Sequence, residues 1–145
     1  MKGLGDMWQT TLVIIKPETA QDGKAVKEII FTLNDRFFIG KIKSFQFTKE
    51  QAEEFYKEHN GKEFYQGLVD YTISAPVIAI TVFGVDAITE IRTIIGDTNP
   101  KYANEKTLRK LYGHELPKNA VHASDSVESA TRELTMMFGD DYGLW

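Results

Sequence analysis

The run PVIAITVF at residues 76–83 constrains the fold more than any other feature of this sequence. Its residues are apolar on both alternations, so a β-strand formed here would need cover on both of its faces. Such a strand is typical of the centre of a sheet. The run is also far shorter than the roughly 20 apolar residues that a membrane-spanning helix requires. We therefore expect a central strand and no membrane partner.

Three further strands are expected along the chain. Residues 11–15 (TLVII) form a β-branched run that ends at Lys16-Pro17, because proline cannot continue a hydrogen-bonded ladder. In the second half of residues 37–47, apolar and polar residues alternate as in a strand, and residues 120–122 have the length of a short strand. The chain therefore offers four strands for one sheet.

Helices are expected between these strands. Four stretches of apolar residues at helical spacing each follow residues that are typical of a helix start. The expected caps are Thr19 with Asp22, Thr48 with Gln51, Asp86 alone, and Asp125 with Glu128. A short extra helix is expected around residues 64–69. The order is βαββαβ followed by a C-terminal helix, which predicts a ferredoxin-like α+β fold, an antiparallel sheet with additional helices.

Length and charge narrow the possible partners. The 145 residues contain no repeat or linker, so we expect a single domain over residues 1–145. The formal net charge is −4, which argues against a specific nucleic-acid partner. There is no cysteine, and the first ten residues show no apolar secretory segment, so a cytoplasmic location is expected.

Several cationic and polar residues stand at the ends of the expected elements or in the irregular segment 97–118. A loop of this length in a compact domain is typical of a functional site. Converging cations would attract a polyphosphate, because arginine matches phosphate oxygens in pairs and lysine adds a point charge. Taken singly, each of these residues could equally be an ordinary surface group. They are Lys16, Arg92, Thr98, Arg109, Asn119 and His122.

His122 and Glu133 suggest a nucleophile and the group that holds it. A neutral imidazole can attack phosphorus if a hydrogen-bond acceptor holds its other nitrogen. Glu133 lies within the apolar stripe of the last helix, where an unpaired carboxylate would be costly. The pattern alone also permits a structural histidine and a Glu133 that reaches the edge of its stripe. The pattern does not decide whether Tyr56 and Phe64 pack in the core or contact a base.

The segment NAVHASDS, from Asn119 to Ser126, closely resembles the active-site signature N-x-x-H-[GA]-S-D-S of nucleoside diphosphate kinases. The resemblance extends from Thr11 to about Phe138 through TLVIIKPE, FYQGLVDY, SAPVIAITVFG and IIGDTNP. It implies an enzyme that transfers the γ-phosphoryl group of a nucleoside triphosphate, chiefly ATP, to a nucleoside diphosphate. The reaction would be a ping-pong one through phosphorylated His122.

The resemblance also assigns roles to individual residues. It implies that Glu133 holds His122 with Ser124 close by, that Phe64 stacks on the base opposite Leu116, and that Lys16 and Asn119 contact the ribose. Mg²⁺ would arrive on the nucleotide phosphates without a dedicated protein ligand, and the protein would be a homo-oligomer, either hexamer or tetramer. The implied phosphate contacts are Lys16, Tyr56, Arg92, Thr98 and Arg109.

A few positions depart from the family pattern. Glu18 replaces the usual Asp, Ala123 replaces the commoner Gly, and Arg109 to Tyr112 read RKLY where Arg-Gly-Asp-Phe is usual. The first two departures are mild, whereas the third bears on the packing of the loop and on subunit contacts but not on the phosphate contact of Arg109. The alternatives are a non-catalytic nucleotide- or protein-binding member and a ferredoxin-like regulatory module. Neither explains why Lys16, His122 and Glu133 are all present.

Overall fold

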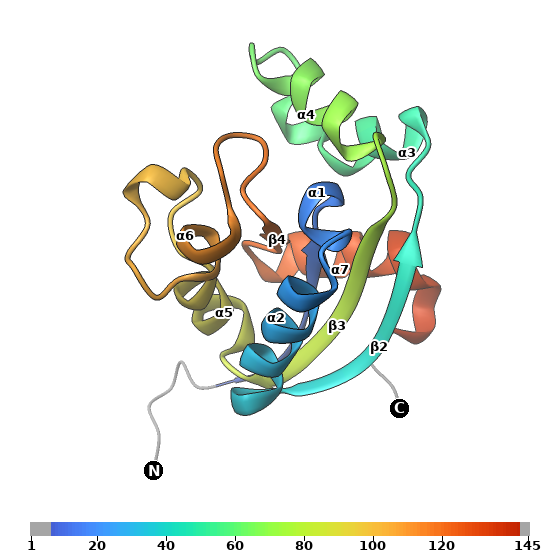
Figure 1. Cartoon of the computed structure of the whole chain (residues 1–145). Coiled ribbons are helices and arrows are strands. Elements are labelled where there is room, and N and C mark those ends of the chain that lie inside the picture. Colours follow the sequence, from blue (N-terminus) through green and yellow to red (C-terminus); the bar gives the residue numbers. More distant parts are fainter. Residues whose placement is uncertain (1–6, 143–145) are drawn as a thin grey trace.

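The computed structural model describes residues 7–142, and these build one four-stranded antiparallel sheet (Figure 1). The strands are β1 (Trp8–Ile15), β2 (Phe38–Phe45), β3 (Val77–Val85) and β4 (Val121–Ala123), in the spatial order β2-β3-β1-β4. Every neighbouring pair is antiparallel. The order places β3 and β1 at the centre, as residues 76–83 predict, and the ferredoxin-like arrangement is confirmed.

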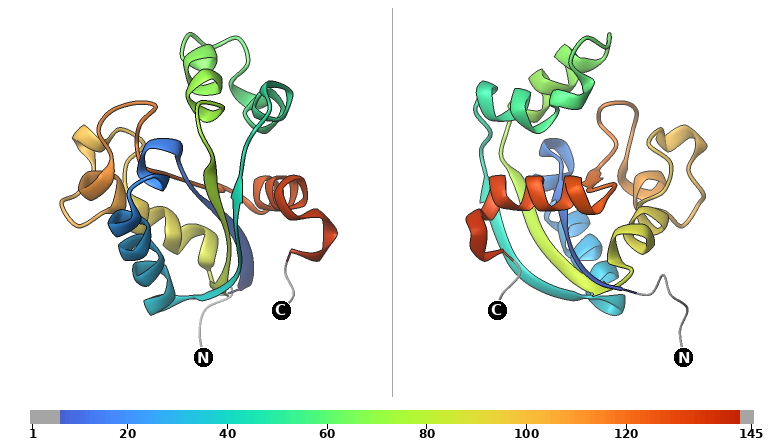
Figure 2. Two further views of the ribbon diagram at one scale, coloured as in Figure 1. Left: turned by 45° about the vertical axis from the view of Figure 1, so that its right-hand side comes forward. Right: turned by 180° about the vertical axis from the view of Figure 1, so that it is seen from behind.

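Helices cover the sheet on both faces because the central strands are apolar on both faces. Leu12 and Ile14 of β1 join one hydrophobic core, while Val13 and Ile15 join the other. Figure 2 shows α7 crossing one face, with α2 and α5 on the opposite face and α3 and α4 standing beyond one end of the sheet. The helices are α1 (Pro17–Ala20), α2 (Gly23–Arg36), α3 (Lys49–Phe55), α4 (Tyr65–Thr72), α5 (Ala87–Ile95), α6 (Leu108–Tyr112) and α7 (Val127–Phe138).

The expected start of the first long helix was wrong. A separate short helix, α1, begins at Pro17, because proline is favoured at the first position of a helix, and Thr19 lies inside α1. The chain then turns, and Asp22 accepts hydrogen bonds from the backbone amides of Lys24 and Ala25, so Asp22 caps α2. Thr48 does form the expected capping box at the start of α3.

The expected cap of α5 is confirmed in position only, and the expected cap of α7 was wrong. Asp86 is the N-cap residue of α5, but its backbone is left-handed with φ 54° and its side chain accepts from the amide of Met7 and from no amide of the first turn of α5. Gln9 instead accepts from the amide of Ile88 in the first turn. The cap of α7 is Ser126, one residue beyond Asp125, and it accepts from the amide of Ser129.

The segment that the sequence left irregular contains two short elements, a 3₁₀ turn η2 (Pro100–Tyr102) and α6. Another 3₁₀ turn, η1 (Lys57–His59), continues α3, and a third, η3 (Gly139–Asp141), follows α7. Within residues 7–142, no helix has the length and apolar character needed to cross a bilayer.

Candidate active site

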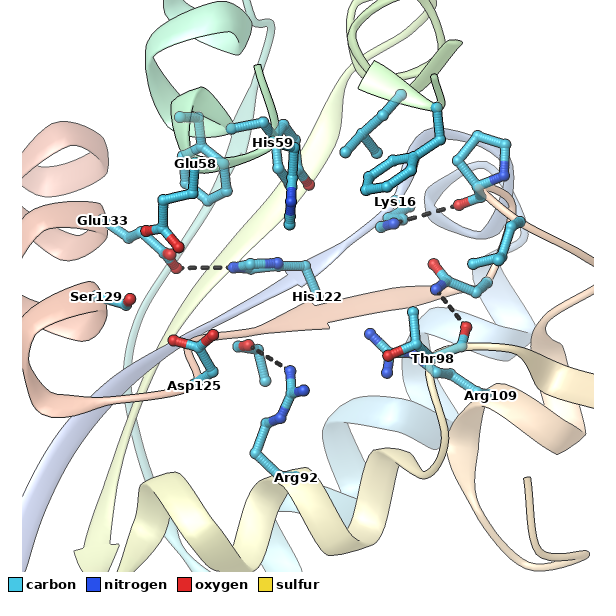
Figure 3. A pocket seen from close by; sticks show the side chains of 18 of the residues that line it. Lys16, Glu58, His59, Arg92, Thr98, Arg109, His122, Asp125, Ser129 and Glu133 are labelled. Atoms are coloured by element: carbon cyan, nitrogen blue, oxygen red, sulfur yellow. Dashed lines mark hydrogen bonds and ion pairs between the residues drawn. The ribbon is translucent and has the colours of Figure 1, made fainter. Parts of the chain in front are cut away.

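One cavity of about 490 Å³ lies where the ends of β1 and β4 meet α3, α4, α5 and the segment before β4 (Figure 3). Every expected site residue except Ser124 lines it, although these residues come from distant parts of the chain. Ser124 is fully buried and contacts Glu133 from behind. The expected lining residues are Lys16, Tyr56, Phe64, Arg92, Thr98, Arg109, Leu116, Asn119, His122 and Glu133.

His122 and Glu133 form a hydrogen bond between the middle of β4 and the buried face of α7. Nε2 of His122 lies 2.7 Å from Oε1 of Glu133. An ionised carboxylate can only accept, so Nε2 carries the proton and Nδ1 carries the lone pair. Ser124 donates a second hydrogen bond to the same carboxylate oxygen at 2.9 Å. The pair therefore fixes both the tautomer and the orientation of the imidazole.

The charge of Glu133 is stabilised although its side chain is buried. Burial alone would raise the pKa of Glu133, but the positive potential of His122, the hydrogen bonds from His122 and Ser124, and the nearby Arg132 together hold the pKa below its ordinary value. Glu133 shares the buried face of α7 with three apolar residues, Ala130, Leu134 and Met137. The expectation of a partner for this carboxylate is confirmed by the geometry.

Three cations of the cavity donate hydrogen bonds to backbone carbonyl oxygens. Lys16 donates to Pro117 at 3.2 Å, and Arg92 donates to Ala123 at 3.1 Å. Arg109 donates to Gly96 at 3.1 Å and to Val121 at 3.0 Å. Because carbonyls are neutral acceptors, these contacts orient the side chains without neutralising their positive charge.

Burial and mutual repulsion raise the free energy of these charges. Burial and then the charge of Arg109 lower the pKa of Lys16 to about 7. Burial and then the charge of Arg92 lower the pKa of Arg109 to about 10. An anion entering the cavity would relieve both effects. The site is therefore suited to bind a multiply charged anion.

An aromatic wall, which we define as Phe55, Tyr56, His59 and Phe64, extends from His122 to the mouth of the cavity. The ring centroids of Phe55 and Tyr56 lie 5.1 and 5.9 Å from that of His122. The ring of His59 stacks on Tyr56 at 6.3 Å and lies 5.1 Å from Phe64. Phe64 is 53% exposed, so its face is accessible to a planar ligand.

The polar groups beside the cations are only partly satisfied. Asn119 donates from Nδ2 to the carbonyl oxygen of Thr98 at 2.8 Å, a hydrogen bond that joins the beginning of the irregular segment 97–118 to the residue that follows it. Its Oδ1 is buried without a partner among the described residues, as are Nε of Arg109 and Nδ1 of His59. Ala120, which follows Asn119, has a left-handed φ of 74°. Buried polar atoms of this kind are suited to meet a ligand.

Sequence reasoning missed several lining residues, among them His59, Asp125 and Arg132. Asp125 was assigned to a helix cap, and a hydrogen bond with Ser129 chiefly lowers its pKa. Arg132 could have been found because it adjoins Glu133 in sequence. Nothing in the local pattern singles out His59, which reaches the cavity only through the packing of α3 and η1.

Comparison with known proteins identifies the family. The nucleoside diphosphate kinase profile matches residues 9–142. This chain belongs to the nucleoside diphosphate kinase family. A nucleoside diphosphate kinase of Haemophilus ducreyi is 42% identical over 135 residues, covering 93% of this chain and 98% of that relative. The nucleoside diphosphate kinase of Archaeoglobus fulgidus is 42% identical over 134 residues, covering 92% and 88%.

Solved structures agree in fold. The chain superimposes on the nucleoside diphosphate kinase of Aquifex aeolicus with a TM-score of 0.88 at 38% identity, covering 94% of this chain and 99% of that one. The enzyme of Encephalitozoon cuniculi gives 0.89 at 30% identity, with coverages of 94% and 93%. The family resemblance is thus confirmed, and the chain is a phosphotransferase with nucleoside diphosphate kinase activity.

Proposed function

We propose that this nucleoside diphosphate kinase works in two steps through a phosphohistidine at His122. Nδ1 attacks the γ-phosphorus of a triphosphate, chiefly ATP, and forms a P–N bond while the bond from that phosphorus to the bridging oxygen breaks. The diphosphate leaves with the electron pair. A terminal oxygen of a second nucleoside diphosphate then attacks the same phosphorus and releases the imidazole.

The hydrogen bond from His122 to Glu133 supports this mechanism most directly. It leaves the lone pair of the imidazole on the nitrogen that Glu133 does not hold. Positive charge develops on the ring as the P–N bond forms, and a carboxylate whose pKa is already lowered stabilises it. Ser124 keeps that carboxylate in place through its own hydrogen bond.

We assign the cations of the cavity to the phosphates. Arg92, Arg109 and Lys16 supply positive charge, and Tyr56 and Thr98, which also line the cavity, supply hydroxyls. Burial and the charge of Glu133 raise the pKa of Tyr56, so its hydroxyl stays protonated and can donate. Mg²⁺ would arrive with the nucleotide as part of the substrate and offset the charge of its phosphates.

The rest of the nucleotide would lie toward the cavity mouth. Asn119 lines the cavity and would meet a ribose hydroxyl, and Lys16, which also lines it, would share that role. Phe64 and Leu116, which are 53% and 52% exposed, would enclose the base between an aromatic and an aliphatic surface. Neither surface reads the edge of a base, so substrates of all common bases should be accepted.

The assembly and location expected from the sequence remain proposals. We propose a homo-oligomer, hexameric or tetrameric, because β2 is an edge strand whose Phe38 and Ile42 are 59% and 48% exposed. We also propose a single domain for residues 1–145 and retain the predicted cytoplasmic location. Sedimentation of a 16.5 kDa monomer at micromolar concentration would refute the oligomer.

Labelling with ATP and Mg²⁺ tests the mechanism. The protein should acquire an acid-labile, base-stable phosphate on His122, and GDP should remove it as GTP. The variant His122→Ala should acquire no such label while keeping its fold by circular dichroism. Full labelling of that variant would overturn the assignment of His122.

A further inference from the structure

Arg132 on α7 makes contacts that neither the sequence pattern nor the proposed mechanism uses. Its guanidinium donates to the carbonyl oxygens of Glu54 and Phe55, each at 3.2 Å, and to the carboxylate of Glu58 at 3.3 Å. The same group lies 3.9 Å from Oε2 of Glu133, the next residue in the chain. One side chain therefore contacts both the end of α3 and the carboxylate that holds His122.

The carbonyls that Arg132 contacts belong to the last turn of α3. The final carbonyl groups of a helix lack partners within the helix, and they carry the negative end of its dipole. A planar guanidinium can serve two such oxygens at once, whereas an ammonium group cannot match their spacing in the same way. The side chain of Arg132 is only 25% exposed, so water competes weakly for these contacts.

The end of α3 leads directly into the aromatic wall. Phe55 and Tyr56, the last residue of α3 and its cap, pack edge-on against His122, and His59 and Phe64 continue the wall to the cavity mouth. Figures 1 and 2 show α3 and α4 standing beyond the end of the sheet, while α7 lies across its face. Arg132 joins these two parts across 77 and 78 residues of sequence.

We propose that Arg132 is a positioning residue that holds the aromatic wall at a fixed separation from His122 and Glu133, and so sets the width of the nucleotide cleft. This inference deepens the proposed function and rests on it. A base stacked on Phe64 and a phosphate beside His122 are bound together only if that separation matches the length of the nucleotide. The positive charge of Arg132 near Glu133 would add a second, smaller effect on the rate of phosphoryl transfer.

The test uses Arg132→Lys, which keeps the charge but loses the fork, and Arg132→Met, which loses both. Each is made in the natural sequence and in a Phe64→Ala background. Single-turnover phosphorylation of His122 by MgATP gives a half-saturating concentration and a limiting rate. Arg36→Met is the matched control, because the guanidinium of Arg36 lies at an exposed site, 3.7 Å from the carboxylate of Glu90, and does not line the cavity. Thermal unfolding is followed for every variant.

We expect Arg132→Lys to raise the half-saturating ATP concentration about five- to tenfold, the value of a lost hydrogen bond or two, with a limiting rate within about twofold of the natural protein. Arg132→Met should show the same rise and, in addition, a lower limiting rate. In the Phe64→Ala background the rise should shrink to less than about twofold, because the wall no longer offers its stacking face.

An equal rise in both backgrounds would overturn the proposal, since Arg132 would then not act through the wall. Unchanged values in both Arg132 variants would overturn it as well. Should Arg132→Met fail to fold, Arg132→Lys in the two backgrounds still decides. Failure of the proposed function is distinguishable, because it appears as labelling of His122→Ala with Arg132 intact.

Discussion

The hydroxyl of Tyr112 donates a hydrogen bond to the carboxylate of Glu28, which joins the last residue of α6 to the first half of α2. Burial first, and then the hydrogen bond and charge of Glu28, raise the pKa of Tyr112 to about 12. A helix of five residues is not stable alone. This contact therefore helps to hold α6, and with it Arg109, against a long helix anchored by Ile29 and Leu33.

The first prediction concerns that contact. Tyr112→Phe keeps the ring in its packing and removes only the hydroxyl, so it should lower the free energy of unfolding by about 1 kcal/mol. Because Arg109 keeps its two carbonyl contacts, KM for a nucleoside diphosphate should rise only about two- to fivefold, as for part of one hydrogen bond. Chemical denaturation and steady-state kinetics measure both effects. A KM unchanged within error would show that α6 is held without Glu28.

The second prediction concerns the partner of His122. Glu133→Gln should slow phosphorylation of His122 on the order of 100-fold, because an amide can fix the wrong tautomer and cannot offset the developing charge. Ser124→Ala removes only a support of that carboxylate and should cost less. Rapid-quench kinetics at saturating ATP separates the two variants. Equal rates for Glu133→Gln and the natural protein would assign Glu133 a purely structural role.

The third prediction follows from the pKa of Lys16, which is about 7 in the ligand-free protein. A bound phosphate favours the charged form and raises that pKa, so the complex holds an extra proton between the two values. Affinity for ADP should therefore be flat below pH 7 and should fall above it, by up to about tenfold per pH unit. Calorimetry at pH 8 in two buffers should detect proton uptake. Lys16→Gln should lose this pH dependence, and a slope that persists in this variant would place the titration elsewhere.

The fourth prediction concerns breadth of substrate. Stacking on Phe64 contributes roughly 1 to 3 kcal/mol for any base and does not read base edges. ADP, GDP, CDP, UDP and dTDP should all be accepted, with the larger rings modestly favoured. Phe64→Ala should weaken every substrate and leave their ranking nearly intact in kcat/KM. A preference beyond about a thousandfold for one base would require an edge-reading group, because stacking differences cannot supply it.

The sequence predicted the sheet and its central strand because residues 76–83 are apolar on both alternations, a local property that the fold retains. It also predicted that Glu133 has a buried partner, since a carboxylate in an apolar stripe needs one. Pattern alone could not choose between a structural and a catalytic His122. That choice came from the NAVHASDS resemblance.

Other features depend on contacts between distant segments and have no local signal. The contacts of Arg132 join residues 77 and 78 positions apart, and Tyr112 meets Glu28 across 84 positions. Asp86 stands at the N-cap position of α5, as its sequence context predicts, but its carboxylate accepts from the amide of Met7, 79 positions away, and not from the first turn of the helix. The short α6 has too few turns for periodicity to show.

The three cations assigned to the phosphates, Lys16, Arg92 and Arg109, donate hydrogen bonds to carbonyl oxygens, in contrast to Arg132, which contacts the carboxylate of Glu58. A phosphate that enters need not break an ion pair before it is recognised, and the solvent reorganisation that charged groups normally require was completed when the chain folded. The ligand-free pocket therefore already has a positive electric field, which Lys16 strengthens when phosphate binding raises its pKa. Nucleotide capture should be fast at low salt and should slow as ionic strength rises, because that field acts on the substrate before contact.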